Sequence, residues 1–134
     1  MVQEHDFWVF DDLSAELQNN SAFTNFFTKG CHHNNCMLAY LTQNAYEHGK
    51  DSTTRTRNCA YQIYFRNKAD IRWIRVLGQQ LTGCSKKFEA IFNEATKQPF
   101  SCLLCDNRVT TPANEQFIGN AFSSEPTYFL VPHK

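Results

Sequence analysis

The sequence predicts an α/β protein with a mostly parallel sheet and flanking helices. Short, wholly apolar runs recur along the chain, which is typical of strands buried on both faces of a parallel sheet. Segments with helical periodicity lie between the later runs, at the spacing of β–α units. The chain has 134 residues, 42% of them hydrophobic. This is enough for one modest core, so we expect residues 1–134 to form a single domain.

The first half of the chain holds two predicted strands. Residues 7–10 read Phe-Trp-Val-Phe and run into two acids, and residues 36–41 read Cys-Met-Leu-Ala-Tyr-Leu and run into Thr-Gln-Asn. Between them, Ser21 is the expected N-cap of a short helix, and Gly30 is expected to end it. Residues 45–58 are polar and are expected to form a loop.

The second half alternates strands and helices. Residues 59–65 read Cys-Ala-Tyr-Gln-Ile-Tyr-Phe and are the third predicted strand. Asp70 is expected to cap one helix and Ser85 to start another, because apolar residues recur after each at helical spacing. A fourth strand is predicted at 100–104 and a last extended stretch at 128–131.

The charges balance overall but not locally. Thirteen basic and thirteen acidic residues give no net charge, so total charge says nothing about nucleic acid. Residues 1–28 carry five acids and no Lys or Arg, whereas residues 55–75 carry six basic residues and one acid. An acidic first strand and a basic middle are compatible with a metal site and a polyanion-facing surface. Two ordinary solvated faces give the same pattern.

Targeting signals are not evident. No apolar run approaches the roughly 20 residues of a membrane span, and the acidic start does not resemble a signal peptide. The six cysteines follow no disulfide framework. We therefore expect reduced thiols in an intracellular protein that is not secreted.

Two acids, Asp11 and Asp12, follow the first strand. An apolar strand that ends on two carboxylates is the pattern of a Walker B element. There the first acid holds Mg²⁺ with ATP, and the second orients or deprotonates the attacking water. Gln43 or Asn44, after the second strand, is a candidate for contact with the γ-phosphate and that water. Polar residues that simply end a strand are the alternative explanation.

Six segments between Phe7 and Phe122 occur in a characteristic order. They are Val9–Leu13, Phe26–His33, Leu41–Asn44, Arg55–Asn58, Tyr64–Asp70 and Leu77–Gln80. Together they resemble the carboxy-terminal half of the viral genome-packaging ATPases of the FtsK/HerA type, which include poxvirus-like, adenovirus-like and Polinton or Maverick enzymes. The resemblance implies a partial RecA-like P-loop ATPase core.

The resemblance also implies roles for particular residues. Asp11 and Asp12 match the Walker B acids, Gln43 matches the sensor position, and Arg55 or Arg57 falls where an arginine reaches a neighbouring subunit's phosphate. It further implies a homo-oligomeric ring that uses Mg²⁺ and ATP to drive double-stranded DNA into a capsid. Capsid or portal proteins would be its partners, in the host nucleus or cytoplasm where virions assemble.

The sequence departs from that family in one respect. No Gly-x-x-x-x-Gly-Lys-Ser/Thr loop occurs in the 134 residues, so the amides and lysine that hold the phosphates are missing. We therefore expect a fragment, a split gene product or an eroded copy that lacks the first βα unit and is inactive as an ATPase alone. Such a chain should expose a strand edge and apolar surface.

Two further functions remain as alternatives. One is a non-enzymatic interaction module that keeps the same fold. The other is a zinc-stabilised nucleic-acid-binding regulatory domain, suggested by the ligands between Cys31 and Cys36; zinc is not expected, because other cysteines lie within predicted strands. DNA contact is expected at four basic residues, which otherwise form a solvated helix face: Arg66, Lys68, Arg72 and Arg75.

Overall fold

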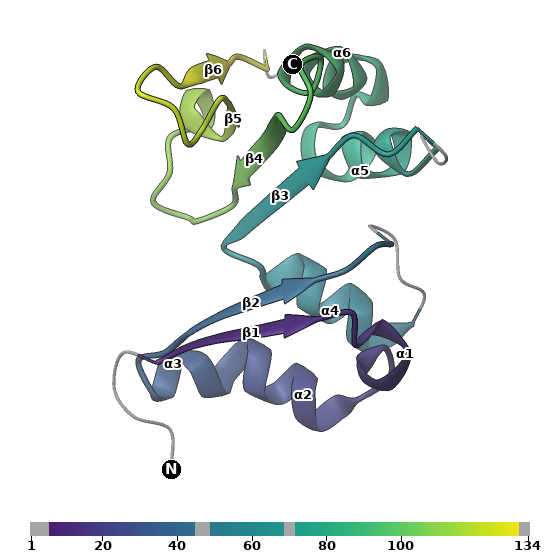
Figure 1. Cartoon of the computed structure of the whole chain (residues 1–134), viewed down its shortest axis with the longest axis vertical. Helices are drawn as coiled ribbons and strands as arrows, with labels where there is room; N and C mark the ends of the chain where they lie inside the picture. The colour runs from purple at the N-terminus through teal and green to yellow at the C-terminus, as the bar shows by residue number, and fades with distance from the viewer. Residues whose placement is uncertain (1–5, 45–48, 69–71, 132–134) are drawn as a thin grey trace. The chain divides into compact units, whose positions relative to one another are not determined.

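The structure is a computed structural model that describes residues 6–44, 49–68 and 72–131. It divides into two compact units, Met1–Cys59 and Ala60–Lys134 (Figure 1). Each unit combines strands with helices, which confirms a mixed α/β fold class. That the units act as one domain stays a prediction, and each is described separately below.

A two-stranded parallel sheet forms the centre of the first unit. β1 (Phe7–Asp11) pairs with β2 (Met37–Leu41) so that Asp11 lies opposite Leu41. These strands confirm the first two predicted ones to within one residue at each end. Helices fill the rest of the unit: α1 (Ser14–Leu17), α2 (Ser21–Asn25), a π-helical turn (Phe26–Gly30), α3 (Cys31–His33) and α4 (Lys50–Asn58).

The helices cover one face of this sheet. Phe10 packs on Phe23 of α2, with ring centroids 4.9 Å apart, and Trp8 packs edge-on against Phe26. Phe7 and Val9 alternate to the other face and remain 61% and 55% exposed. The prediction that these strands are buried on both faces is therefore wrong, whereas the expected exposed apolar surface is present.

The helix between the strands is longer than the sequence indicates. Its N-cap is Asn20, whose side chain accepts a 2.9 Å hydrogen bond from the amide of Phe23. Gly30 does not end the helix, because its backbone is helical. A Cβ at Gly30 would lie 2.7 Å from the Phe26 ring, so glycine here permits close packing. The helix continues to His33.

The polar segment expected to be a loop contains α4. The buried residues of this helix are Ser52 and Arg55, both polar. A helix whose buried side chains are polar shows no apolar periodicity, so the pattern that identifies helices in a sequence was absent.

The second unit contains an antiparallel sheet in the order β3–β4–β5–β6. A mostly parallel sheet is not shown, since parallel pairing in the described ranges is confined to β1 and β2. The strands of the second unit are β3 (Tyr61–Phe65), β4 (Cys102–Asp106), β5 (Phe117–Gly119) and β6 (Thr127–Phe129).

Two helices separate β3 from β4 and explain the antiparallel pairing. α5 (Arg72–Thr82) and α6 (Ser85–Ala95) are joined by two residues and pack on each other (Figure 1). A single helix after β3 would return the chain to the level at which β3 begins, so that the next strand would run parallel to it. A hairpin of two helices returns the chain to the level at which β3 ends. β4 therefore begins beside the end of β3. The expected cap Asp70 lies outside the described residues.

The core of the second unit lies where α6 packs on the sheet. Phe88 and Phe92 of α6 are 0% and 1% exposed, and the Phe88 ring lies 5.7 Å from that of Phe117 in β5. Trp73 of α5 packs edge-on against Phe92. β4 is the strand with the most complete burial in this unit, as its apolar sequence predicts.

Candidate functional site

The ends of β1 and β2 bring together the residues predicted to act on nucleotide. Gln43 Nε2 donates a hydrogen bond of 3.1 Å to Asp12 Oδ1. Asp11 is the last residue of β1, directly before Asp12. Asp12 and Gln43 meet because the carboxyl ends of parallel neighbours lie at one edge of a sheet.

Local backbone and hydroxyl contacts support this edge. Asp12 has a positive φ of 55°, a left-handed conformation that Asp adopts more readily than most residues. Just beyond it, the hydroxyls of Ser14 and Thr42 lie 3.2 Å apart, and the Tyr40 hydroxyl donates to Ser14 at 3.2 Å. These hydroxyls join the segments that follow the two strands. Sequence reasoning missed them, although each lies within four residues of a predicted strand end.

The chemistry of the donors fits a hard cation such as Mg²⁺. Carboxylate oxygens are its preferred protein ligands, and it is usually held by one or two carboxylates together with substrate phosphates. Asp11, Asp12 and Gln43 are all exposed. Burial therefore does not strengthen these charges. The described ranges contain no cluster of three or more His, Cys, Asp or Glu placed to hold a metal by themselves.

Arg55 does not lie where an arginine that acts on a neighbouring subunit must lie. It is 2% exposed. Its guanidinium donates to the hydroxyl of Thr24 at 2.8 Å and to that of Ser52 at 3.3 Å. It also stacks over the rings of Phe23 and Tyr40. In this environment Arg55 holds α4 against α2. Arg57, on the same helix, is exposed.

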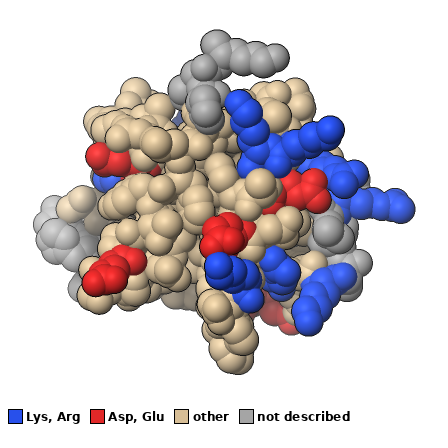
Figure 2. All heavy atoms as spheres, turned by 90° about the horizontal axis from the view of Figure 1, so that it is seen from above, with Lys and Arg blue, Asp and Glu red and all other residues tan. Residues whose placement is uncertain are grey.

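The four basic residues expected at DNA differ in their surroundings. Arg66 donates to Thr96 and Asn93 of the segment around α6, and Arg75 pairs with Glu89 at 3.2 Å. All four residues are exposed. Figure 2 shows basic side chains gathered toward one side of the view, with acidic side chains among them.

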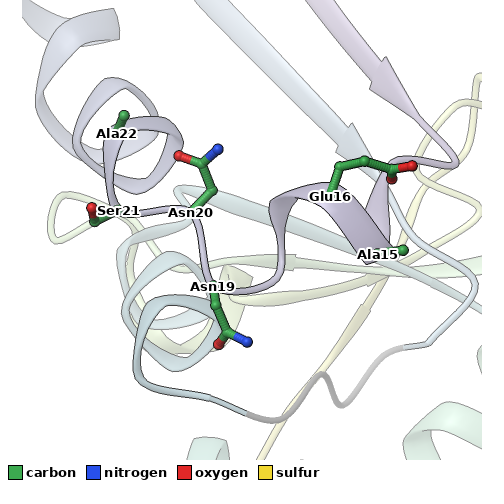
Figure 3. A pocket seen from close by; sticks show the side chains of 6 residues that line it. All are labelled: Ala15, Glu16, Asn19, Asn20, Ser21 and Ala22. Carbon is green, nitrogen blue, oxygen red and sulfur yellow. The ribbon is translucent and has the colours of Figure 1, made fainter.

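A polar hollow of about 380 Å³ lies at the connection between α1 and α2 (Figure 3). Its lining side chains come from that connection alone and include neither Asp12 nor Gln43: Ala15, Glu16, Asn19, Asn20, Ser21 and Ala22. It is wide open to solvent. The hollow is therefore separate from the strand-end site.

A second polar feature, in the second unit, was not anticipated. Asp106, at the end of β4, is 6% exposed and receives two charged hydrogen bonds from Arg108, of 3.0 and 2.7 Å. These bonds hold the pKa of the Asp106 carboxyl below its usual range. Arg108 also lies over the Tyr61 ring. The pair fastens the loop after β4, beside an open hollow of about 330 Å³.

The cysteines are free thiols in this structure. Burial raises the pKa of Cys105 to about 12 and that of Cys59 to about 11. Among the described residues they form no metal cluster with histidines or acids. None of the described helices is both long and apolar enough to cross a membrane.

The strand-end arrangement thus contains three of the residues singled out by sequence: Asp11, Asp12 and Gln43. Comparison with known proteins adds no identity: no family model, no curated protein and no solved structure matches the chain.

Proposed function

We propose that this chain is the Walker-B-bearing part of an ATPase that packages viral DNA, with a RecA-like P-loop core completed by a segment that carries the phosphate loop. The observation that supports the proposal best is the hydrogen bond from Gln43 to Asp12. It joins two neighbouring parallel strands at their carboxyl ends, where α/β proteins bind ligands. The ordered resemblance to FtsK/HerA-type packaging ATPases adds independent support.

In this proposal each strand-end residue has one task. Asp11 holds Mg²⁺ that arrives with ATP, and Asp12 orients the water that attacks the γ-phosphate. Gln43 fixes the Asp12 carboxylate and contacts the same water. Arg57, which is exposed on α4, meets the developing charge in a neighbouring subunit of a homo-oligomeric ring.

The bare face of the β1–β2 sheet supports a missing structural part. Phe7, Val9 and Met37 lie on this face and are 61%, 55% and 67% exposed. An apolar sheet face of this kind is usually covered. A βα unit with the Gly-x-x-x-x-Gly-Lys-Ser/Thr loop would cover it and supply the phosphate-binding amides.

Double-stranded DNA is the proposed polymer substrate, with capsid or portal proteins as partners. Lys68 is exposed and is the better candidate for a phosphate contact. Arg66 and Arg75 already hold α6 through Asn93 and Glu89. Phosphate contacts of this type carry no sequence preference and weaken steeply with salt.

The decisive experiment uses Mn²⁺, a paramagnetic substitute for Mg²⁺, on the isolated chain. Addition of Mn²⁺ should broaden the side-chain amide signal of Gln43 in a ¹⁵N spectrum before it broadens other glutamine signals. Asp11→Asn should reduce this broadening at least several-fold, because Asp11 is the residue that holds the ion. Glu16→Gln is the matched control, because Glu16 is also an exposed acid of the first unit. Equal broadening in the wild type and Asp11→Asn would contradict the proposal.

A non-enzymatic interaction module is the second candidate, and the exposed apolar face favours it. In this alternative the exposed face still binds a partner, but Asp11 and Asp12 have no role. Under this alternative Mn²⁺ does not bind at Asp11, and the chain still associates with itself or with an ATPase subunit. A monodisperse monomer in light scattering, together with absent Mn²⁺ binding, would exclude both candidates.

A further inference from the structure

The helix that precedes β2 ends in a turn that brings two cysteines together. The amide of Cys36 donates a 3.1 Å hydrogen bond to the carbonyl of Cys31, and Asn35 between them has a positive φ of 50°. A six-residue hydrogen-bonded turn with a left-handed residue before its last position is the Schellman ending of a helix. This ending frequently brings the side chains of its first and last residues together. Here both of those residues are cysteines.

The two thiols differ in their access to solvent. They are close enough for Cys36 to act on the pKa of Cys31. Cys31 is 8% exposed, whereas Cys36 is half-buried. Burial, and secondarily the hydrogen bond to Cys36, raises the pKa of Cys31 to about 11. A dissolved oxidant therefore meets Cys36 first, and Cys31 stands behind it as the second thiol.

We propose that Cys31 and Cys36 form a reversible intrachain disulfide, which makes the helix end before β2 a redox modification site. This inference does not depend on the proposed ATPase role. The geometry favours it because a turn fixes the two side chains against each other, whereas a disulfide between mobile segments must first bring them together.

The reaction is thiol–disulfide exchange with a small disulfide such as oxidised glutathione. The Cys36 thiolate attacks one glutathione sulfur, and one glutathione leaves as a thiol. Cys31 then loses its proton to water and attacks the Cys36 sulfur, which displaces the second glutathione as a thiolate that takes up a proton. Two protein thiols are oxidised, and one glutathione disulfide is reduced to two thiols.

The bond would act on β2. This strand begins at Met37, directly after Cys36, and Gln43 follows its other end. A disulfide anchors the strand's first residue to the helix that covers the sheet. Amide hydrogen exchange at Met37 and Leu38 should therefore slow in the oxidised form, and reduction should restore the original rate.

The test is differential alkylation of the full chain after equilibration with reduced and oxidised glutathione. Trypsin releases residues 30–50 as one peptide, in which Cys31 and Cys36 are the sole cysteines, and residues 76–86, which contain only Cys84. The first peptide should resist alkylation and weigh two hydrogens less than its reduced form. The Cys84 peptide is the internal control and should carry a free thiol or one glutathione.

Two variants separate the steps. In Cys31→Ser, Cys36 should accumulate one bound glutathione that is not displaced. In Cys36→Ser, Cys31 should stay a thiol under the same conditions. The wild-type reaction should accelerate as pH rises toward the pKa of Cys31, near 11. Stable glutathione on Cys36 of the wild type, or a disulfide that joins two chains through these residues, would overturn the proposal.

Discussion

Arg55 of α4 donates a 2.8 Å hydrogen bond to the hydroxyl of Thr24 in α2, and this bond joins two helices of the first unit across 31 positions of sequence. The guanidinium is almost completely removed from water. Its charge is stabilised by hydroxyl and carbonyl acceptors and by the faces of Phe23 and Tyr40. An arginine in such surroundings acts on stability rather than on a distant ligand.

Replacement of Arg55 by Met should lower the free energy of unfolding of the first unit by about 2–3 kcal/mol. The variant keeps much of the volume but leaves the Thr24 and Ser52 hydroxyls without their charged donor. Arg57→Met should change stability by less than about 0.5 kcal/mol, because Arg57 is exposed. Hydrogen exchange of β2 amides measures both values. Similar losses in the two variants would show that burial of Arg55 has no energetic consequence.

Two substitutions of Asp12 separate the effect of its backbone conformation on stability from the effect of its charge. Asn tolerates the left-handed φ of 55° nearly as well as Asp, so Asp12→Asn should leave stability unchanged within about 0.5 kcal/mol. Asp12→Val should cost about 1–2 kcal/mol, because a β-branched side chain is strained there. Urea denaturation provides the comparison. If Val were tolerated as well as Asn, the left-handed conformation at this position would be refuted.

Gly78→Ala should destabilise the second unit by about 1–3 kcal/mol. Alanine is the better helix former by about 1 kcal/mol, but its Cβ would lie 2.7 Å from the Cβ of Phe88, which is fully buried. The clash with an immobile core residue outweighs propensity. The control is Gln79→Ala, at the next position of α5, where the side chain is exposed. Thermal unfolding should separate the two variants, with Gln79→Ala at or above the wild type.

The Asp106–Arg108 pair should make the second unit sensitive to acid. The folded-state pKa of Asp106 is lowered, so its stabilisation is fully present above the unfolded value of 3.8 and is lost as pH falls below it. Asp106→Asn should cost about 1–2 kcal/mol near neutral pH, and this difference should shrink in more acidic solution. Urea denaturation at several pH values measures it. A difference that grows on acidification would contradict the direction of the pKa shift.

Several elements of the fold were predictable from local pattern. The apolar runs predicted β1 through β4 to within two residues at each end, and β4 as a whole lies two residues further along the chain than predicted. Helical spacing of apolar residues identified α5 and α6. The helix α4 was missed because it buries Ser52 and Arg55. Local pattern detects an element only when that element buries apolar side chains.

The candidate site was predictable to a similar extent. The acids and Gln43 were identified because polar residues directly follow apolar strands, and parallel pairing of β1 with β2 places them together. The contact of Cys31 with Cys36 was not, because Gly30 was expected to end the helix. Gly30 instead accommodates the Phe26 ring, and the helix ends at the left-handed Asn35.

The sequence by itself determined the mixed α/β composition, the positions of most strands and helices, and the acids at the end of the first strand. These depend on interactions between residues that are close along the chain. Only the tertiary structure decided the strand directions in the second unit, the bare face of the first sheet and the burial of Arg55. Each depends on which distant segments pack together, and no local periodicity records that choice.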